Sequence, residues 1–151
     1  MLLFVEGKME QKIYEIDDEM IEWIKSQNEW VKGHLAPESQ YKFDTSEGKM
    51  YLLQGIIDKK LYNKDQTQEL QALGICFGEI LKTELELDWV IVEDEYGRDP
   101  ALKYKDSSII HFPRTMISKR IEKNEKININ DLLKNAKKIH KEIVDKGNKE
   151  S

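Results

Sequence analysis

The sequence predicts an α+β fold in one domain, ordered as three helices, a three-stranded antiparallel meander and two further helices. Apolar residues recur at helical spacing up to about residue 81, which predicts amphipathic helices. Four consecutive apolar residues, Trp89–Val92, predict a strand covered on both faces, and the helical period returns after Pro113. With 151 residues, of which 39% are hydrophobic, a single domain over 1–151 can bury its own core.

The first helix is predicted over about 17–33. Asp17-Asp18-Glu19 supplies an N-cap and negative charge at the positive end of the helix dipole. Gly33 ends the helix, and residues 34–43, which include a proline, are predicted to form a loop. The helical spacing of the apolar residues predicts core positions for Trp23 and Trp30.

Two more helices are predicted over about 45–62 and from about 65 through Leu81. An Asp followed three residues later by Glu or Gln is expected to cap each of them, at Asp44 and at Asp65. The later helix is apolar on most sides and is therefore expected to be central. It carries Gly74 and Gly78 on one face, which predicts close packing against another backbone, either the following strand or the second helix.

The strands follow in short steps. Trp89–Val92 is predicted to be an interior strand, followed by a turn from Asp94 to Pro100 built around Gly97. Alternation around Leu102–Tyr104 predicts a half-exposed second strand, and Ser108–Phe112 a third. Because the connections are short, we expect neighbouring strands to be antiparallel.

Two helices complete the predicted domain. One spans about 113–123, and the last follows Asn130, which is expected to cap it. The polar residues from Lys146 to Ser151 are expected to be a flexible tail.

Charge is unevenly distributed along the chain. Residues 1–100 hold 22 acidic and 11 basic residues, whereas residues 101–151 hold 7 acidic and 13 basic ones, for a total net charge of −5. The usual outcome in one domain is that basic elements lie beside acidic ones. The alternatives are an acidic face for a basic partner, or a basic face for nucleic acid.

The single cysteine and the lack of a signal-peptide pattern predict a cytoplasmic protein. One cysteine excludes an internal disulfide framework, which favours a reducing compartment. Leu2–Val5 is too short for a membrane span or a signal-peptide core, so no membrane partner is expected. Met9 is a second candidate start, which would make residues 1–8 an unstructured tail or no part of the protein.

Several motifs occur in a fixed order over roughly residues 65–125. They are Gly-x-x-x-Gly-Glu, a Trp-bearing strand, an Asp-Glu-Tyr-Gly turn, Phe-Pro-Arg and a basic helix, formed here by Gly74, Gly78, Glu79, Trp89, Asp94, Glu95, Tyr96, Gly97, Phe112, Pro113, Arg114, Lys119 and Arg120. This order resembles an uncharacterised bacterial family of unknown function, of the DUF3806 type. The resemblance implies a fold and no reaction.

A polar seam of Asp94, Glu95, Tyr96, Arg114 and Arg120 is the candidate binding site. Acidic residues crowd the predicted turn, and carboxylates can hold a hard cation or transfer protons. Arg114 and Arg120 follow a predicted helix start, where anions bind but a cation needs a partner. The competing interpretation is an internal set of ion pairs, in which the acids Glu93, Asp94, Glu95 and Asp99 meet Arg98, Arg114 or Arg120. For Arg114 the acids of residues 93–95 are the expected partners.

No catalytic residue, metal site or cofactor is predicted. Ser108 and His111 lie three apart on a strand, so their side chains should point to opposite faces rather than form a dyad. Cys76 lies in a largely apolar helix, which indicates a buried, inert thiol. Three scattered histidines do not have the spacing of a metal site, and no phosphate-binding or dinucleotide loop is present.

The leading functional hypothesis is a noncatalytic module that binds another protein, with a basic partner favoured, as an adaptor or an immunity protein would. The acidic first 100 residues motivate it, because acidic surfaces accelerate the capture of basic partners. One alternative is a small hydrolase or transferase with its site at the Asp94–Tyr96 turn. Another is nucleic-acid binding through the basic C-terminal helices, which the overall negative charge disfavours.

Overall fold

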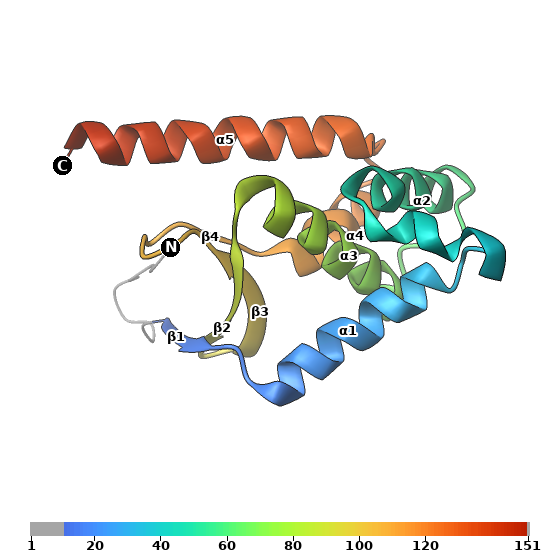
Figure 1. The fold of residues 1–151 in the computed structure, drawn as a ribbon, viewed down its shortest axis with the longest axis horizontal. Helices are drawn as coiled ribbons and strands as arrows, with labels where there is room; N and C mark the ends of the chain where they lie inside the picture. The colour runs from blue at the N-terminus through green and yellow to red at the C-terminus, as the bar shows by residue number, and fades with distance from the viewer. Residues whose placement is uncertain (1–10, 151) are drawn as a thin grey trace.

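The computed structural model describes residues 11–150 and the side chains of residues 11–148. Figure 1 shows an α+β arrangement with α3 at its centre, flanked by the sheet and the other helices. The expectations for Leu2–Val5 and Met9 lie outside the described residues. The elements follow in the order β1 (Lys12–Glu15), α1 (Asp18–Lys32), the 3-10 helix η1 (Pro37–Asp44), α2 (Ser46–Asp58), α3 (Thr67–Leu85), β2 (Asp88–Asp94), β3 (Gly97–Lys103), β4 (Ile110–His111), the 3-10 turn η2 (Pro113–Thr115), α4 (Met116–Glu122) and α5 (Ile129–Glu150).

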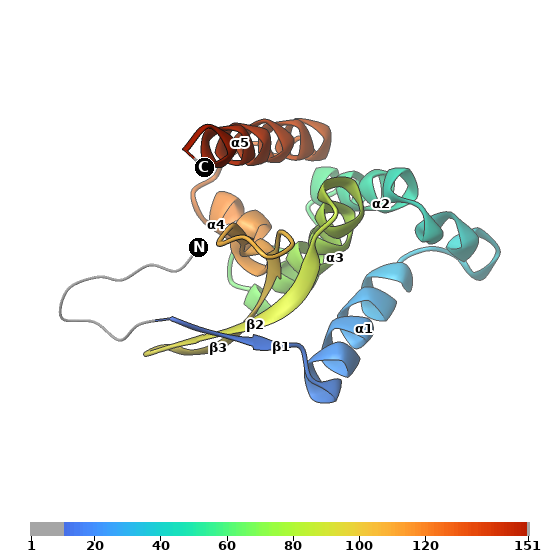
Figure 2. The ribbon, with the colours of Figure 1, turned by 60° about the vertical axis from the view of Figure 1, so that its left-hand side comes forward.

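The sheet has four antiparallel strands in the order β1-β2-β3-β4, one more than predicted. Figure 2 shows β1 alongside β2 and β3. β1 pairs with β2 from Lys12 opposite Glu93 to Glu15 opposite Val90. It therefore gives β2 a neighbour on each side, and the predicted interior strand is confirmed. Ile91 and Val92 are 0% and 2% exposed, as a strand covered on both faces requires. The sequence does not reveal β1, because a four-residue strand is defined by its partner rather than by its own pattern.

The predicted turn around Gly97 is confirmed and is shorter than expected. β2 and β3 pair up to Asp94 opposite Gly97, which leaves only Glu95 and Tyr96 in the loop. Gly97 has φ +123°, a conformation that an L side chain rarely adopts. The Asp94 carboxylate accepts a 2.8 Å hydrogen bond from the Tyr96 N–H and closes the turn.

The two glycines of α3 allow the close packing that their spacing predicts. A Cβ at Gly74 would lie 2.6 Å from the Pro113 carbonyl oxygen, and one at Gly78 would lie 2.7 Å from the Trp89 ring. Gly74 thus packs against the backbone of η2, as predicted, whereas the contact of Gly78 is with the Trp89 and Pro113 rings rather than with backbone. The partners are η2 and the following strand, rather than the second helix. This contact positions Arg114, which follows Pro113 in η2.

The residues that cap the helix N-termini are only partly those predicted. Asp17 caps α1 as expected, with its carboxylate 2.8 Å from the Met20 N–H. Thr45 rather than Asp44 caps α2, through a 3.0 Å bond from the Gly48 N–H to its hydroxyl. Asn128 rather than Asn130 caps α5, by accepting from the Asp131 N–H at 3.0 Å. Before each of the first two helices the sequence offers a carboxylate or hydroxyl side chain that could act as the cap. Which of these oxygens accepts from the free N–H groups depends on the path of the backbone, which the sequence does not show.

Three further expectations need correction. Most of the predicted loop 34–43 belongs to the 3-10 helix η1 (Pro37–Asp44), and α3 begins at Thr67 without a side-chain cap from Asp65. α5 itself continues to Glu150, and the flexibility expected from Lys146 onward stays a prediction. Trp30 is 39% exposed and packs edge-on against His34 rather than in the core.

Candidate functional site

Arg114 lies at the centre of the polar contacts between the sheet and the helices. Its guanidinium Nη2 is 2.6 Å from Asp99 Oδ1 on β3, and its Nη1 donates to Gln71 Oε1 on α3 at 3.4 Å. Burial raises the pKa of the Asp99 carboxyl above its ordinary value, and the Arg114 charge opposes that rise. Both side chains of this pair are partly buried, and the permanent charge of Arg114 favours the ionised form of Asp99.

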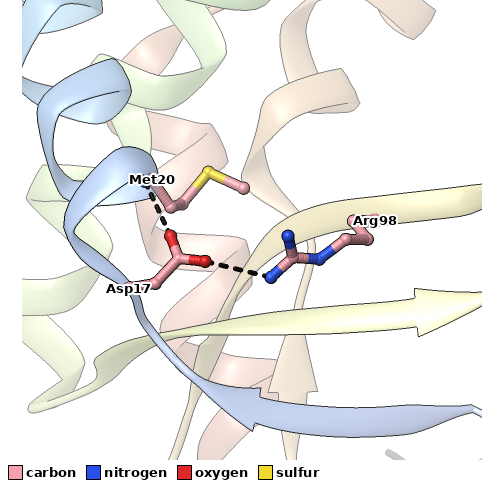
Figure 3. A network of polar contacts seen from close by, with 3 residues as sticks. All are labelled: Asp17, Met20 and Arg98. Atoms are coloured by element: carbon pink, nitrogen blue, oxygen red, sulfur yellow. Dashed lines mark hydrogen bonds and ion pairs between the residues drawn. The ribbon is translucent and has the colours of Figure 1, made fainter.

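A second ion pair closes the same region from the N-terminal side. Arg98 Nη2 donates to Asp17 Oδ2 at 3.1 Å, while Asp17 Oδ1 caps α1 (Figure 3). The hydrogen bond from the Met20 N–H, and then the one from Arg98, lower the pKa of Asp17. Asp17 thus joins the start of α1 to β3.

The two arginines line a hollow of about 300 Å³, called here the arginine pocket. It lies between the start of α1, β3 and η2. Its walls combine charge with apolar surface, from Asp17, Glu19, Met20, Trp23, Arg98, Pro100 and Arg114. Since each arginine already has a carboxylate partner, the pocket presents hydrogen-bonding capacity rather than a free positive charge.

The structure separates the residues of the predicted polar seam. Asp94 closes the β2–β3 turn, Glu95 is exposed and Tyr96 is 83% exposed. A side-chain hydrogen bond with Glu95 raises the pKa of the Tyr96 phenol. Arg120 lies in the last turn of α4, where it donates to the Met116 carbonyl at 2.7 Å, and not at a helix start.

Arg114 has a carboxylate partner as predicted, but the partner is Asp99 instead of an acid at 93–95. β3 packs against η2, so a β3 residue reaches Arg114, whereas the turn extends beyond that contact. Asp17 and Gln71 were not predicted as site residues. Asp17 carried only a capping signal, and no local pattern marks Gln71.

Several motif residues of the family pattern meet around Trp89. The Trp89 indole N–H donates to Glu79 Oε2 at 2.5 Å, and the same ring contacts the bare face of Gly78 beside the Pro113 ring. One glycine, one acid, one tryptophan and one proline from three elements therefore form a single packing unit. Packing alone accounts for these residue types at these positions.

The candidate nucleophile Cys76 is buried, and the candidate base His111 contacts another histidine. Cys76 is 0% exposed, and burial raises the pKa of its thiol to about 12, which keeps it protonated at neutral pH. His111 Nε2 lies 3.0 Å from His140 Nδ1 on α5 rather than near a serine. Burial, and then the neighbouring His140, lower the pKa of His111 to about 4. Over residues 11–148, no three His, Cys, Asp or Glu side chains gather as a metal site would require.

A comparison with protein-family models identifies the family of this chain. The model described as "Domain of unknown function (DUF3806)" matches residues 49–132, more than half of the sequence. The chain belongs to the DUF3806 family. The resemblance predicted over residues 65–125 is confirmed and extends further in both directions. The comparison with curated proteins found no match.

One solved structure shares the fold of this DUF3806 protein. It is a crystal structure of a protein from Bacteroides thetaiotaomicron VPI-5482, with a TM-score of 0.70 and 20% sequence identity over 88% of this chain. The match covers 50% of that protein, so the present chain spans about half of its length. At this identity the likeness establishes the fold alone.

The DUF3806 match divides the arginine pocket. Its lining residues Arg98, Pro100 and Arg114 fall inside residues 49–132, whereas Asp17 and the wall from α1 fall outside it. The Arg114–Asp99 pair therefore belongs to the family domain, and the Asp17–Arg98 pair attaches α1 to it. Among the helices of residues 11–150, none combines the length and hydrophobicity of a membrane span.

Proposed function

We propose that this chain is a noncatalytic module that binds a basic region of another protein, as an adaptor or an immunity protein does. The binding surface in this proposal is the outer α1 face, formed by Asp18, Ile21, Glu22 and Glu29. All four side chains are exposed, and Ile21 is 44% exposed. This exposed acidic strip with an apolar residue beside it is the observation that carries the proposal.

Charge supports a basic partner. Residues 12–32 contain six acidic residues and three lysines, and in the outer α1 face only Lys25 interrupts the acids. Asp17 is paired with Arg98, but no ion pair engages Asp18, Glu22 or Glu29 in the described part of the chain. Unpaired like charges at a surface attract the opposite charge and raise association rates.

The neighbouring strand adds a second means of attachment. β1 is the end strand of the four-stranded sheet that the described residues form, and its Tyr14 is 42% exposed. An end strand offers backbone N–H and C=O groups to an extended segment of a partner. Exposed tyrosine is also enriched at protein interfaces.

The noncatalytic part of the proposal draws support from the arginine pocket and the thiol. Arg98 and Arg114 are each held by a carboxylate, and Cys76 is buried. The residues of the hydrolase alternative, Glu95 and Tyr96, point to solvent at a hairpin tip. A catalytic group needs a partner within hydrogen-bond reach and a place for the substrate.

The test is a comparative capture experiment. Wild-type protein on beads is exposed to lysate at low salt beside the triple variant Asp18→Asn/Glu22→Gln/Glu29→Gln. The control variant removes the same charge elsewhere, as Glu122→Gln/Glu142→Gln/Asp145→Asn. We expect a stoichiometric basic protein to be retained by the wild type and the control and lost from the α1 variant. Equal capture by all three, or no stoichiometric partner, contradicts the proposal.

A second candidate function, nucleic-acid binding, has one observation in its favour. A surface hollow of about 480 Å³ between α4 and α5 is lined by Arg120, Lys126, Lys134 and Lys138, with Asp131 as its acid. Phosphate contacts by these side chains would make binding fall steeply with salt. Fluorescence anisotropy with labelled single-stranded and duplex DNA from 20 mM salt upward tests this; a flat titration at the lowest salt eliminates it.

A further inference from the structure

A second pocket, larger than the arginine pocket, lies where α2, α3 and α4 meet. It has a volume of about 660 Å³, within the range of about 300–1,000 Å³ common for small-molecule sites. It is called here the helix-end pocket, because α2 and α4 both end at its rim. None of its residues takes part in the proposed binding by the outer α1 face.

The floor of the helix-end pocket is apolar and rigid. Leu70 and Leu73 of α3 are each 1% exposed, and Ile56 of α2 is 3% exposed, so these side chains belong to the core. Ile57 and Ile121 form partly buried walls. Because the floor side chains are almost fully covered already, a ligand that enters would bury apolar surface mainly against the partly exposed Ile57 and Ile121, over an ordered floor.

The rim is formed by backbone of defined shape. Lys60, after α2, has φ +52°, and Asn124, after α4, has φ +57°. In both cases the following N–H bonds back into the helix, from Leu61 to Ile56 at 3.3 Å and from Glu125 to Arg120 at 2.9 Å. These left-handed helix ends turn the chain away sharply and leave the pocket between them.

Tyr62 forms a neutral polar wall. His34 Nδ1 lies 2.9 Å from the Val31 carbonyl and 3.2 Å from the Trp30 carbonyl, so Nδ1 carries the proton and Nε2 accepts. The Tyr62 hydroxyl therefore donates to His34 Nε2 at 2.7 Å. Burial, and then the charge of Glu69, raise the pKa of Tyr62, so the phenol stays uncharged.

The charged groups around the pocket favour an anion. Lys60, Lys64 and Lys126 line it, against Asp58 and Glu125. Asp58 already accepts a 2.9 Å hydrogen bond from Gln54, whereas no ion pair engages the three lysines in the described part of the chain. The lysines exceed the acids by one charge, and the partial negative charge of the two helix ends opposes this excess; the preference for an anion therefore rests on lysine side chains that no acid engages rather than on a net positive field.

The pocket also lies within the family domain. Its lining residues run from Ile56 to Ile127, inside the matched range 49–132. The arginine pocket, by contrast, takes Asp17, Glu19, Met20 and Trp23 from outside that range. A site carried by the domain itself is the better candidate for a property of the domain.

We infer that the helix-end pocket binds a small amphipathic anion, with an apolar body against the walls Ile57 and Ile121 and an acidic group among Lys60, Lys64 and Lys126. The apolar contact supplies most of the affinity, because exposed ion pairs contribute only about 0.2–1 kcal/mol each. The lysines select the sign of the charged group.

The first experiment titrates the folded chain with 8-anilinonaphthalene-1-sulfonate, an aromatic anion whose fluorescence rises in apolar sites. We expect saturable binding to one site, with displacement by decanoate and not by decyltrimethylammonium, which has a chain of the same length and the opposite charge. Near-ultraviolet circular dichroism on the same samples reports whether the chain stays folded. Absence of saturable binding, or equal displacement by both chains, overturns the inference.

Variants locate the site. Ile121→Trp fills the pocket and is expected to weaken binding at least tenfold, and Lys64→Ala/Lys126→Ala about fivefold. The matched control, Lys25→Ala/Lys82→Ala, removes two exposed charges outside the pocket and should leave binding unchanged. If Ile121→Trp does not fold, Ile57→Phe replaces it. Amide shifts of the wild type with decanoate give an independent reading: shifts centred on Tyr62 and Leu70 support the site, and shifts centred elsewhere refute it.

Discussion

Gly74 and Gly55 are interior glycines of neighbouring helices whose replacement by alanine should have opposite effects. Alanine in place of a helical glycine stabilises by about 0.5–1 kcal/mol through backbone entropy and helix propensity. At Gly55 in α2 an added Cβ meets nothing within 4 Å, so only this gain applies. At Gly74 in α3 the added Cβ lies 2.6 Å from the Pro113 carbonyl oxygen and nearer still to that of Arg114. These are backbone atoms, which cannot rotate away.

The expected magnitudes follow from these contacts. Forced overpacking costs about 1–3 kcal/mol, and a clash with backbone belongs at the upper end, so Gly74→Ala should destabilise by about 1–2 kcal/mol after its propensity gain. Gly55→Ala should stabilise by about 0.5–1 kcal/mol. For a chain of this size, each kcal/mol moves the melting temperature by about 2–4 °C.

Urea unfolding followed by circular dichroism at 222 nm measures both variants against wild type. An unchanged slope with denaturant shows that the compared states are the same. A Gly74→Ala protein as stable as wild type would refute the assignment of η2 as the backbone packed on α3. A destabilised Gly55→Ala protein would refute the open space at α2.

Three further predictions concern protons, a buried acid and a helix cap. The pKa of His111 is lowered to about 4 from 6.5, so as the pH falls the unfolded chain takes up the proton before the folded chain does. The free energy of unfolding is therefore highest above about pH 6.5 and decreases toward pH 4. The decrease amounts to at most about 2 kcal/mol, because the partial exposure of the ring weakens the effect. Urea midpoints from pH 7.5 to 4.5 should show this fall, and His111→Phe should flatten it; an equal slope in the variant argues against the assignment. Trp89→Phe leaves the partly buried Glu79 without its 2.5 Å donor and should cost about 1.5–3 kcal/mol, with most of the loss recovered when Glu79→Gln is added; no recovery would point to packing alone. Thr45→Ala should cost about 1 kcal/mol by removing the α2 cap, whereas Asp44→Ala should cost little, and equal thermal shifts in the two variants would contradict the observed cap.

The candidate site could be predicted from sequence only in part. The excess of acids around residue 94 and the need of Arg114 for a partner are visible in the sequence. Which acid fills that need depends on β3 packing against η2, and that contact selects Asp99. Asp17 illustrates the same limit, because its capping role is local while its bond to Arg98 spans 81 positions.

Local chemistry in the sequence determined the turn at Gly97, the cap at Asp17, the covered strand at Trp89–Val92 and the close packing at Gly74 and Gly78. Each of these follows from backbone freedom, hydrogen-bonding groups or apolar periodicity within a few residues. Only the tertiary structure decided that Lys12–Glu15 is a strand, that Arg114 pairs with Asp99, and that two helix ends enclose the helix-end pocket. These features require segments far apart in the chain to meet, and the burial that drives them together is nondirectional, so it leaves no local pattern to read.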